Sequence, residues 1–210
     1  MKNAFLLMTA VLFVGMIIVG CGNDDNEDTH TPDYFPMAVG NSWTFQVFER
    51  DSFGHDTTYT QTQSLNHTAT KDSFEWYVMF LMDGDSITDS IYYRKDAYFL
   101  YAGYFFEISG IFNFVPILAA PLTPEVGFSQ ADTAQLGMFS IYSNVVVEAK
   151  ETITVPRGTY ECYRELLTIE SSLLTLTMRS WFADTIGPIR LITLSSGDST
   201  DMTLESYVKH

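Results

Sequence analysis

Hydrophobic residues recur at every second position over several stretches of this 210-residue chain, with polar residues between them. Alternation with period two is typical of β-strands that bury one face, whereas helices repeat every three or four residues. No stretch carries a sustained helical repeat. The pattern therefore predicts an all-β protein. Predicted strands lie near 43–47, 57–70, 74–82, 87–94, 98–101, 145–155, 160–169, 174–182, 189–194 and 202–208.

Short turns separate the alternating stretches. Asp83-Gly84 is a strong hairpin signal, residues 155–158 fit a type I turn, and Gly187-Pro188 and residues 195–198 mark two further turns. Short connections between successive strands imply an antiparallel meander. We expect about nine to eleven strands in one domain, residues 34–210. A flat sheet of this size would expose an apolar face and two edges, so we expect it to curl into a half-barrel or barrel.

Two stretches are harder to assign. Residues 57–70 are rich in Thr and Gln, which predicts an exposed or edge strand. Residues 105–118 are apolar without a clean period, and prolines at 116, 121 and 124 interrupt this region. It fits either a strand followed by a loop or a helical turn that covers one end of the barrel.

The first 20 residues are typical of a secretory signal peptide, with Lys2 followed by an apolar run. The run ends in Ile18-Val19-Gly20-Cys21, which resembles the lipobox of bacterial lipoproteins. That resemblance implies cleavage before Cys21 and acylation of the cysteine, with more than one acyl chain as a stable membrane anchor. Two alternatives remain open: an uncleaved membrane helix, and a plain signal peptide followed by an unrelated cysteine.

Residues 21–33 contain five acids and predict a disordered tether. Acids directly after the cysteine resemble the surface-export signals of Bacteroidetes-type lipoproteins, although a solvated spacer explains them equally well. Residues 21–210 carry 10 basic and 26 acidic side chains, a net charge of −16. This charge argues against a nucleic-acid partner and against electrostatic attraction to anionic lipid. The predicted location is the cell envelope, with the outer membrane or cell surface favoured over the inner membrane.

Three motifs carry a resemblance to a known group of proteins. They are the opening at 34–43 (YFPMAVGNSW), the turn at 155–163 (VPRGTYECY) and the ending at 181–189 (WFADTIGPI). Together they resemble bacterial envelope lipoproteins of the DUF3108-like and TapB-like kind, with Thr185 standing where a glycine is usual. The resemblance implies an antiparallel half-barrel related to the lipoprotein carriers of the LolA type. It implies no activity.

The residues that could support catalysis or metal binding are scattered. The four histidines, at 30, 55, 67 and 210, show no metal-ligand spacing, and no nucleophile motif is present. Asp83, Asp85 and Asp89 flank one turn without the spacing of a calcium loop. Glu75 and Glu107 lie beside aromatic residues, and Cys162 is expected to be a buried apolar side chain. The sequence therefore predicts no enzyme, metal or cofactor.

Aromatic residues make up 15% of the chain and are the remaining feature. They could line a concave apolar ligand site, or they could simply fill the core. If the aromatic residues line a ligand site, the protein is expected to be an envelope lipoprotein that binds a hydrophobic ligand or a protein partner. If they fill the core, it is expected to be a structural or adhesive subunit, and a hydrolase with two convergent carboxylates is a third alternative. The candidate ligand-binding residues are Trp43, Phe45, Trp76, Phe80, Phe99 and Phe105.

Overall fold

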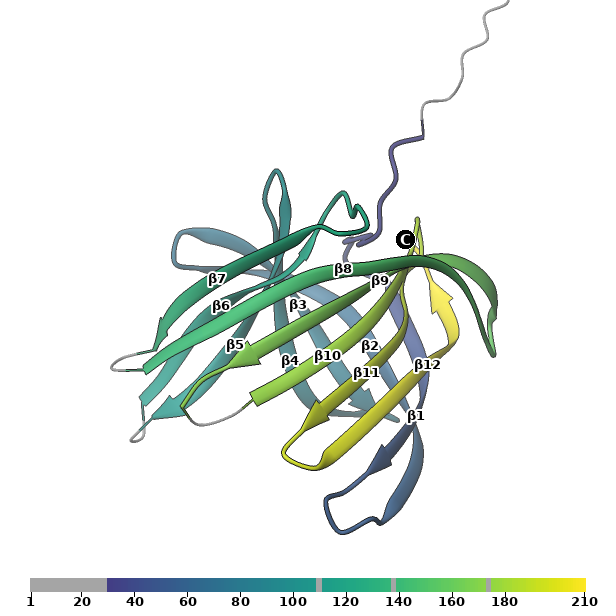
Figure 1. Cartoon of the computed structure of the whole chain (residues 1–210), viewed down its shortest axis with the longest axis horizontal. Coiled ribbons are helices and arrows are strands. Elements are labelled where there is room, and N and C mark those ends of the chain that lie inside the picture. The colour runs from purple at the N-terminus through teal and green to yellow at the C-terminus, as the bar shows by residue number, and fades with distance from the viewer. Residues whose placement is uncertain (1–29, 109–110, 137–138, 173–174) are drawn as a thin grey trace, which may run out of the picture. The chain divides into compact units, whose positions relative to one another are not determined.

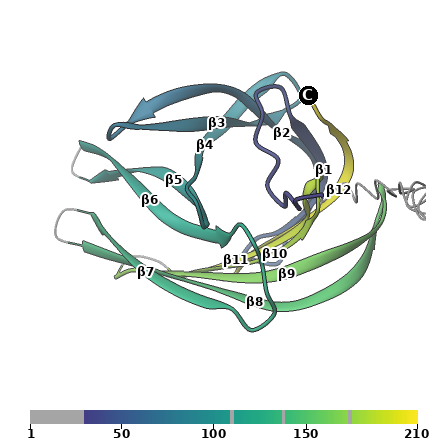
Figure 2. The same cartoon turned by 90° about the horizontal axis from the view of Figure 1, so that it is seen from above.

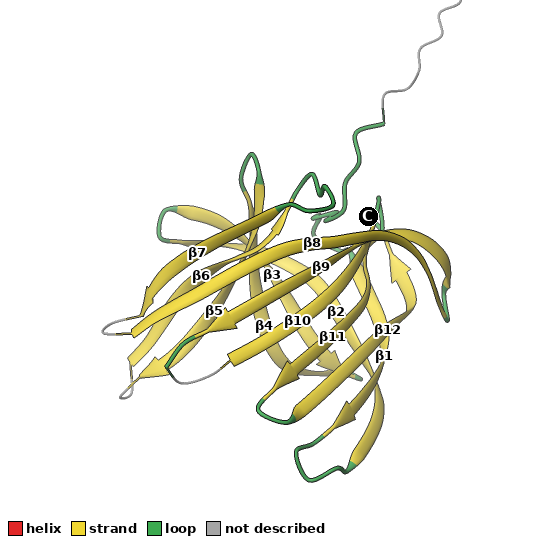
Figure 3. Ribbon diagram, viewed as in Figure 1, coloured by secondary structure: helices red, strands yellow, loops and turns green. Residues whose placement is uncertain are grey.

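The computed structural model describes residues 30–108, 111–136, 139–172 and 175–210, with only the backbone at 106–108, 111, 112 and 136. Every regular element in these ranges is a β-strand, as Figure 3 shows. The all-β prediction is confirmed, with twelve strands where nine to eleven were expected. The strands are β1 (Ser42–Arg50), β2 (Asp56–Lys71), β3 (Phe74–Asp83), β4 (Ser86–Lys95), β5 (Phe99–Ile108), β6 (Ile111–Pro121), β7 (Ser129–Leu136), β8 (Phe139–Val155), β9 (Gly158–Glu170), β10 (Thr175–Ala183), β11 (Gly187–Ser195) and β12 (Asp198–Val208).

The compact unit that contains these strands runs from Pro32 to His210. Cys21 and most of the predicted tether lie outside the described residues. The ranges that the structure describes contain no helix long and apolar enough to cross a membrane.

All twelve strands form one antiparallel sheet in the order β6-β5-β4-β3-β2-β1-β12-β11-β10-β9-β8-β7 (Figure 1). Each strand pairs with its neighbour in sequence, except that β1 pairs with β12 and the chain crosses from β6 to β7 without a ladder between them in the described residues. The sheet curves into the ring seen in Figure 2, which brings its two ends together. Val115 and Ile117 of β6 pack against Ile141 and Val145 of β8 at this seam. The result is a nearly closed barrel.

Two parts of the sheet differ from the expectation. Strand β2 is not an edge strand, because it lies between β1 and β3, but much of it is exposed as the other alternative expected. The apolar stretch at 105–118 forms the end of β5 and most of β6 instead of a loop or helical turn. Pro116 does not end β6, because β6 is an end strand whose outer side needs no ladder donor. Strand β7 was not predicted, since its sequence SQADTAQL is polar and lacks alternation.

The tight turns explain how the meander keeps its twist. Ser196 and Gly197 both have positive φ in the two-residue loop between β11 and β12, which matches the twist of the paired strands. The loop between β2 and β3 also has two residues with positive φ, Asp72 at 49° and Ser73 at 68°, and neither is a glycine. This turn carries no glycine signal in the sequence, although Asp tolerates this conformation better than most residues.

The core lies inside the barrel in three clusters of buried apolar residues. One is built around Trp43, Phe45 and Val47 of β1, and a second lies at the seam between β6 and β8. The third joins Phe35, from the coil before β1, to Leu100 and Ala120 of β5 and β6. Residues of all three clusters line one internal cavity.

Candidate functional site: an apolar cavity inside the barrel

The interior of the barrel contains a partly open cavity of about 280 Å³. This is close to the lower end of the ~300–1,000 Å³ usual for small-molecule sites. Apolar side chains make most of its wall, and they come from β1–β6, β9–β12 and the coil before β1. Representative lining residues are Met79, Leu81, Leu100, Leu167, Ile169, Leu176, Met178 and Leu191.

Strand alternation places these side chains. On β9, Leu167 and Ile169 point inward, and the register pairs them with Met178 and Leu176 of β10, which also line the cavity. The same period of two directs Glu165 inward, two residues before Leu167. The sequence therefore places a carboxyl group at a position where the pattern demands an apolar residue.

Glu165 is 2% exposed, and among the described residues it is the only buried acid. Neither of its carboxyl oxygens has a hydrogen-bond partner in the described part of the protein. Burial raises the pKa of Glu165 well above the ordinary value for a glutamate, because the apolar surroundings penalise the charged form. Burial therefore favours the neutral form of this carboxyl group, which can donate one hydrogen bond and accept others.

The remaining polar groups that line the cavity are also uncharged. They are the amides of Gln61 and Gln63, the hydroxyls of Ser180 and Thr193, and the phenols of two tyrosines, Tyr93 and Tyr104. Burial raises the pKa of Tyr104 to about 12 and raises the pKa of Tyr93 as well, so both phenols keep their protons. None of the described residues that line the cavity is a Lys, Arg or His.

The coil before β1 forms one wall of the cavity through Phe35, Pro36 and Met37. In Figure 2 this coil lies within the outline of the ring of strands. Phe35 contacts the ring of Phe182 at 4.4 Å between centroids, and the Asn41 side-chain amide donates to the Pro36 carbonyl at 2.8 Å. The YFP segment of the opening motif is therefore part of the cavity wall.

Polar contacts fix the start of this coil to the barrel. The Asp33 amide donates to Oδ1 of Asp184 at 2.8 Å, and the Thr185 amide donates to the Asp33 carbonyl at 2.8 Å. Lys95 Nζ lies 2.8 Å from Oδ1 of Asp33. Asp33, which was assigned to the tether, is thus held by three contacts to the barrel.

The structure does not bring the six predicted ligand residues to one place. Trp43 lines the cavity, and its indole N–H donates to the Ile186 carbonyl at 2.6 Å. Phe45 is completely buried in the cluster beside it. Phe99 packs near Phe128 at the seam, at 6.2 Å between centroids. The other three, Trp76, Phe80 and Phe105, do not line the cavity.

Phe105 belongs to the set of β5 residues that alternates with the lining residues Ala102 and Tyr104. Trp76 and Phe80 lie on the outer face of β3, both faces of which are apolar. Met79 and Leu81 point into the cavity, so the alternating set that includes Trp76 and Phe80 points away from it. Outside the barrel, the ring of Trp76 meets Phe114 at 5.0 Å. The alternation predicted the strand correctly but could not say which face lies inside.

A polar network covers the outer face of β8, β9 and β10. Arg164 pairs with Glu148 and Glu151 at 2.9 Å each, and Arg179 pairs with the same Glu148 at 2.9 Å. These two arginines lower the pKa of Glu148 against the opposing effect of its partial burial. Each carboxylate of this network pairs with an arginine. The ion pairs therefore hold neighbouring strands together and do not indicate a reactive site.

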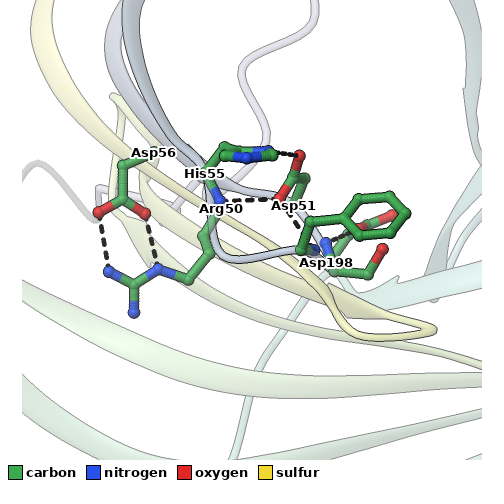
Figure 4. A network of polar contacts seen from close by, with 7 residues as sticks. Arg50, Asp51, His55, Asp56 and Asp198 are labelled. Carbon is green, nitrogen blue, oxygen red and sulfur yellow. Dashed lines mark hydrogen bonds and ion pairs between the residues drawn. The ribbon is translucent and has the colours of Figure 1, made fainter.

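A second network joins two hairpin loops, as Figure 4 shows. Asp51 accepts hydrogen bonds from the backbone of Phe53 and His55, and Asp198 accepts one from the Ser52 amide at 2.6 Å. Arg50 and Asp56 form a bidentate pair at the base of the same loop. These groups are exposed and form hydrogen bonds and ion pairs with one another. They therefore stabilise the two loops.

The other residues considered for catalysis do not converge. Glu75, Asp83, Asp85 and Asp89 are exposed, and the side chain of Glu107 lies outside the described residues. Within the described ranges, no group of three His, Cys, Asp or Glu residues could hold a metal ion.

Cys162 is 1% exposed, which confirms that it is a buried side chain. Burial raises the pKa of its thiol to about 12, so the reactive thiolate form is suppressed.

Neither protein-family models nor curated protein sequences match this chain. Two solved structures resemble it, each covering 85% of this chain and 100% of its own. One is a candidate lipoprotein of Parabacteroides distasonis, with 12% identity and a TM-score of 0.50. The other is a candidate exported protein with a YmcC-like fold from Bacteroides fragilis, with 13% identity and a TM-score of 0.42. The first likeness supports the barrel fold, whereas no family model supports the DUF3108-like or TapB-like resemblance.

Proposed function

We propose that this protein is a non-enzymatic lipoprotein of the bacterial cell envelope that binds a hydrophobic ligand inside its barrel. The cavity of about 280 Å³, lined mainly by apolar side chains, is the observation that carries this proposal. Such concave apolar sites with a few polar groups are the usual form of small-molecule binding sites. The lipobox-like sequence that ends at Cys21 supports the lipid anchor, with the outer membrane or cell surface as the favoured location.

The two competing functions fit the geometry less well. A structural or adhesive subunit was expected to have a filled core, and the cavity departs from that expectation. A hydrolase was expected to bring two carboxylates together in a cleft, whereas Glu165 is the only acid among the described residues that line the cavity. The binding function is therefore the better supported of the three.

Native mass spectrometry of the full-length protein, extracted from membranes in mild detergent, tests the proposal. We expect the mass of an acylated chain together with a retained apolar molecule. The same sample should also bind N-phenyl-1-naphthylamine, a neutral dye that fluoresces in apolar surroundings. A protein that retains no molecule and binds no dye would contradict the ligand-binding function.

A matched pair of variants locates the site. Ala102 lines the cavity at 3% exposure, so Ala102→Phe should fill it and abolish dye binding. Ala131 lies exposed on β7, so Ala131→Phe adds the same side chain outside the barrel and should bind dye like the unaltered protein. Because overpacking can unfold a barrel, Ala119→Leu is a milder second variant at the cavity wall. Thermal unfolding of each variant shows whether loss of binding reflects loss of folding.

A further inference from the structure

The cavity contains one polar group whose presence the fold does not explain. The Glu165 carboxyl lies among apolar residues of β9 and β10, and neither oxygen has a hydrogen-bond partner in the described residues. A buried polar group without a partner is destabilising, and buried polar groups in proteins usually have one. The cross-strand neighbour of Glu165 is Ser180, which is also buried and lines the cavity. These two side chains make a polar spot on the part of the wall formed by β9 and β10.

Resting on the proposed ligand-binding function, we propose that this cavity selects an uncharged amphiphile: an apolar chain that carries a hydroxyl or amide group. The hydroxyl or amide hydrogen-bonds to the Glu165 carboxyl, and the apolar chain lies against the leucine and methionine side chains of β9, β10 and β3. The ligand thereby provides the hydrogen-bond partner that the protein lacks at this position.

The charge of the wall argues against an anionic ligand. A carboxylate or phosphate in the cavity would have no Lys, Arg or His to pair with among the lining residues. It would lie beside the only acid of the cavity, in a chain whose net charge is already −15. Burying an unpaired charge costs far more than burying a hydrogen-bonded neutral group. Fatty acid anions should therefore bind poorly.

A cationic ligand is also disfavoured. An ammonium group would have to ionise Glu165 and form a buried ion pair in which both members lose their water. The attraction within such a pair often fails to repay the desolvation. The other polar groups of the wall, including Gln61, Gln63 and Thr193, are neutral and suit a hydroxyl or amide equally well.

Competition of chain-matched probes against the naphthylamine dye at pH 7 tests the selectivity. We expect dodecanol and dodecanamide to displace the dye with dissociation constants about tenfold lower than those of dodecanoate and dodecylamine. One buried hydrogen bond contributes about that factor to the affinity. Tighter displacement by dodecanoate, or by dodecylamine, would overturn the assignment of a neutral headgroup.

Two variants show whether Glu165 is responsible. Glu165→Gln keeps a neutral donor and acceptor and should retain the preference for dodecanol. Glu165→Leu removes both and should lose the preference while still binding the dye. Unchanged selectivity in Glu165→Leu would overturn the role of Glu165. Failure of the unaltered protein to bind the dye or any probe would instead contradict the proposed function itself, so the two failures are distinct.

Discussion

Burial of Glu165 couples the stability of the barrel to pH. Burial raises the pKa of Glu165 in the folded protein well above its unfolded value of about 4.3. The folded chain therefore keeps this proton over a pH range in which the unfolded chain has lost it. The stabilisation from this group is fully present below about pH 4 and is lost as the pH rises through the folded pKa. The other ionisable groups of the cavity, Tyr93 and Tyr104, stay protonated over this range.

Glu165→Gln should remove this pH dependence. Between pH 4 and pH 8 the melting temperature of the variant should rise relative to that of the unaltered protein. The unfolding free energy of the variant should gain on that of the unaltered protein by up to about 1.4 kcal/mol per pH unit. This gain should stop once the pH reaches the pKa of Glu165 in the folded protein. Thermal unfolding at a series of pH values measures it. Glu170→Gln, an exposed position on the same strand, is the control and should give a curve parallel to the unaltered protein; a parallel curve for Glu165→Gln would show that the carboxyl is not held neutral.

Cys162 offers a second test at the residue scale. Burial raises the pKa of its thiol to about 12, and the side chain is 1% exposed. In a Cys21→Ser variant, where Cys162 is the only thiol, a disulfide reagent at pH 8 should react at least about a hundredfold more slowly with native than with urea-unfolded protein, because the thiolate is scarce and shielded. Comparable rates in the two states would show that β9 is open to solvent at this position.

At the scale of single elements, the hairpin of β5 and β6 depends on a glycine. An added Cβ at Gly103 would lie 2.3 Å from Cζ of Phe114 and 3.2 Å from the Trp76 ring. The Phe114 ring therefore lies directly over the glycine, in the aromatic cluster outside the barrel. Only glycine leaves room for this ring on the strand that pairs with β6.

Gly103→Ala should lower the free energy of unfolding by about 1–3 kcal/mol, the usual cost of overpacking, as measured by urea denaturation. The pair with Phe114→Ala tests the cause. Removing the ring should make the added methyl group harmless, so the double variant should be no less stable than Phe114→Ala alone. Additive losses would mean that the Phe114 ring is not the cause and that another neighbour, such as the Trp76 ring at 3.2 Å, excludes the methyl group.

The elements also show what could be predicted from the sequence. Some strands have one apolar face and adjoin a turn with a clear sequence signal. Such strands, including β1 and the β3–β4 hairpin at Asp83-Gly84, depend on local sequence and were predicted. The inner position of β2 was not, because its Thr- and Gln-rich sequence resembles that of an edge strand although hairpins join it to both β1 and β3. Strand β7 has no alternation to detect, and the choice between the two apolar faces of β3 depends on how the whole sheet curves. Glu165 was missed for the same reason, although its spacing from Leu167 and Ile169 was visible.

At the scale of the whole molecule, the barrel divides into two surfaces with opposite properties. The interior is apolar apart from one neutral carboxyl and a few amide and hydroxyl groups. The acids gather elsewhere, on outer faces and loops, where cations such as Arg164 and Arg179 pair with some of them. A chain with a net charge of −15 has little electrostatic attraction to an anionic membrane. Under the proposed function, the predicted lipid on Cys21 would therefore be the main attachment to the membrane.

Cys21→Ser in the full-length chain should move the protein from the membrane fraction to the soluble fraction. The substitution leaves the β-domain intact, because the compact unit begins at Pro32. Acyl chains contribute about 0.8 kcal/mol for each buried CH₂ group, so their loss removes the main attraction to the bilayer. Fractionation with a high-salt wash measures the change, and thermal unfolding of the soluble protein shows that the barrel still folds. Cys162→Ala is the matched control, since it removes the other cysteine and should remain with the membrane. A Cys21→Ser protein that stays bound after the wash would show that another part of the chain holds it there.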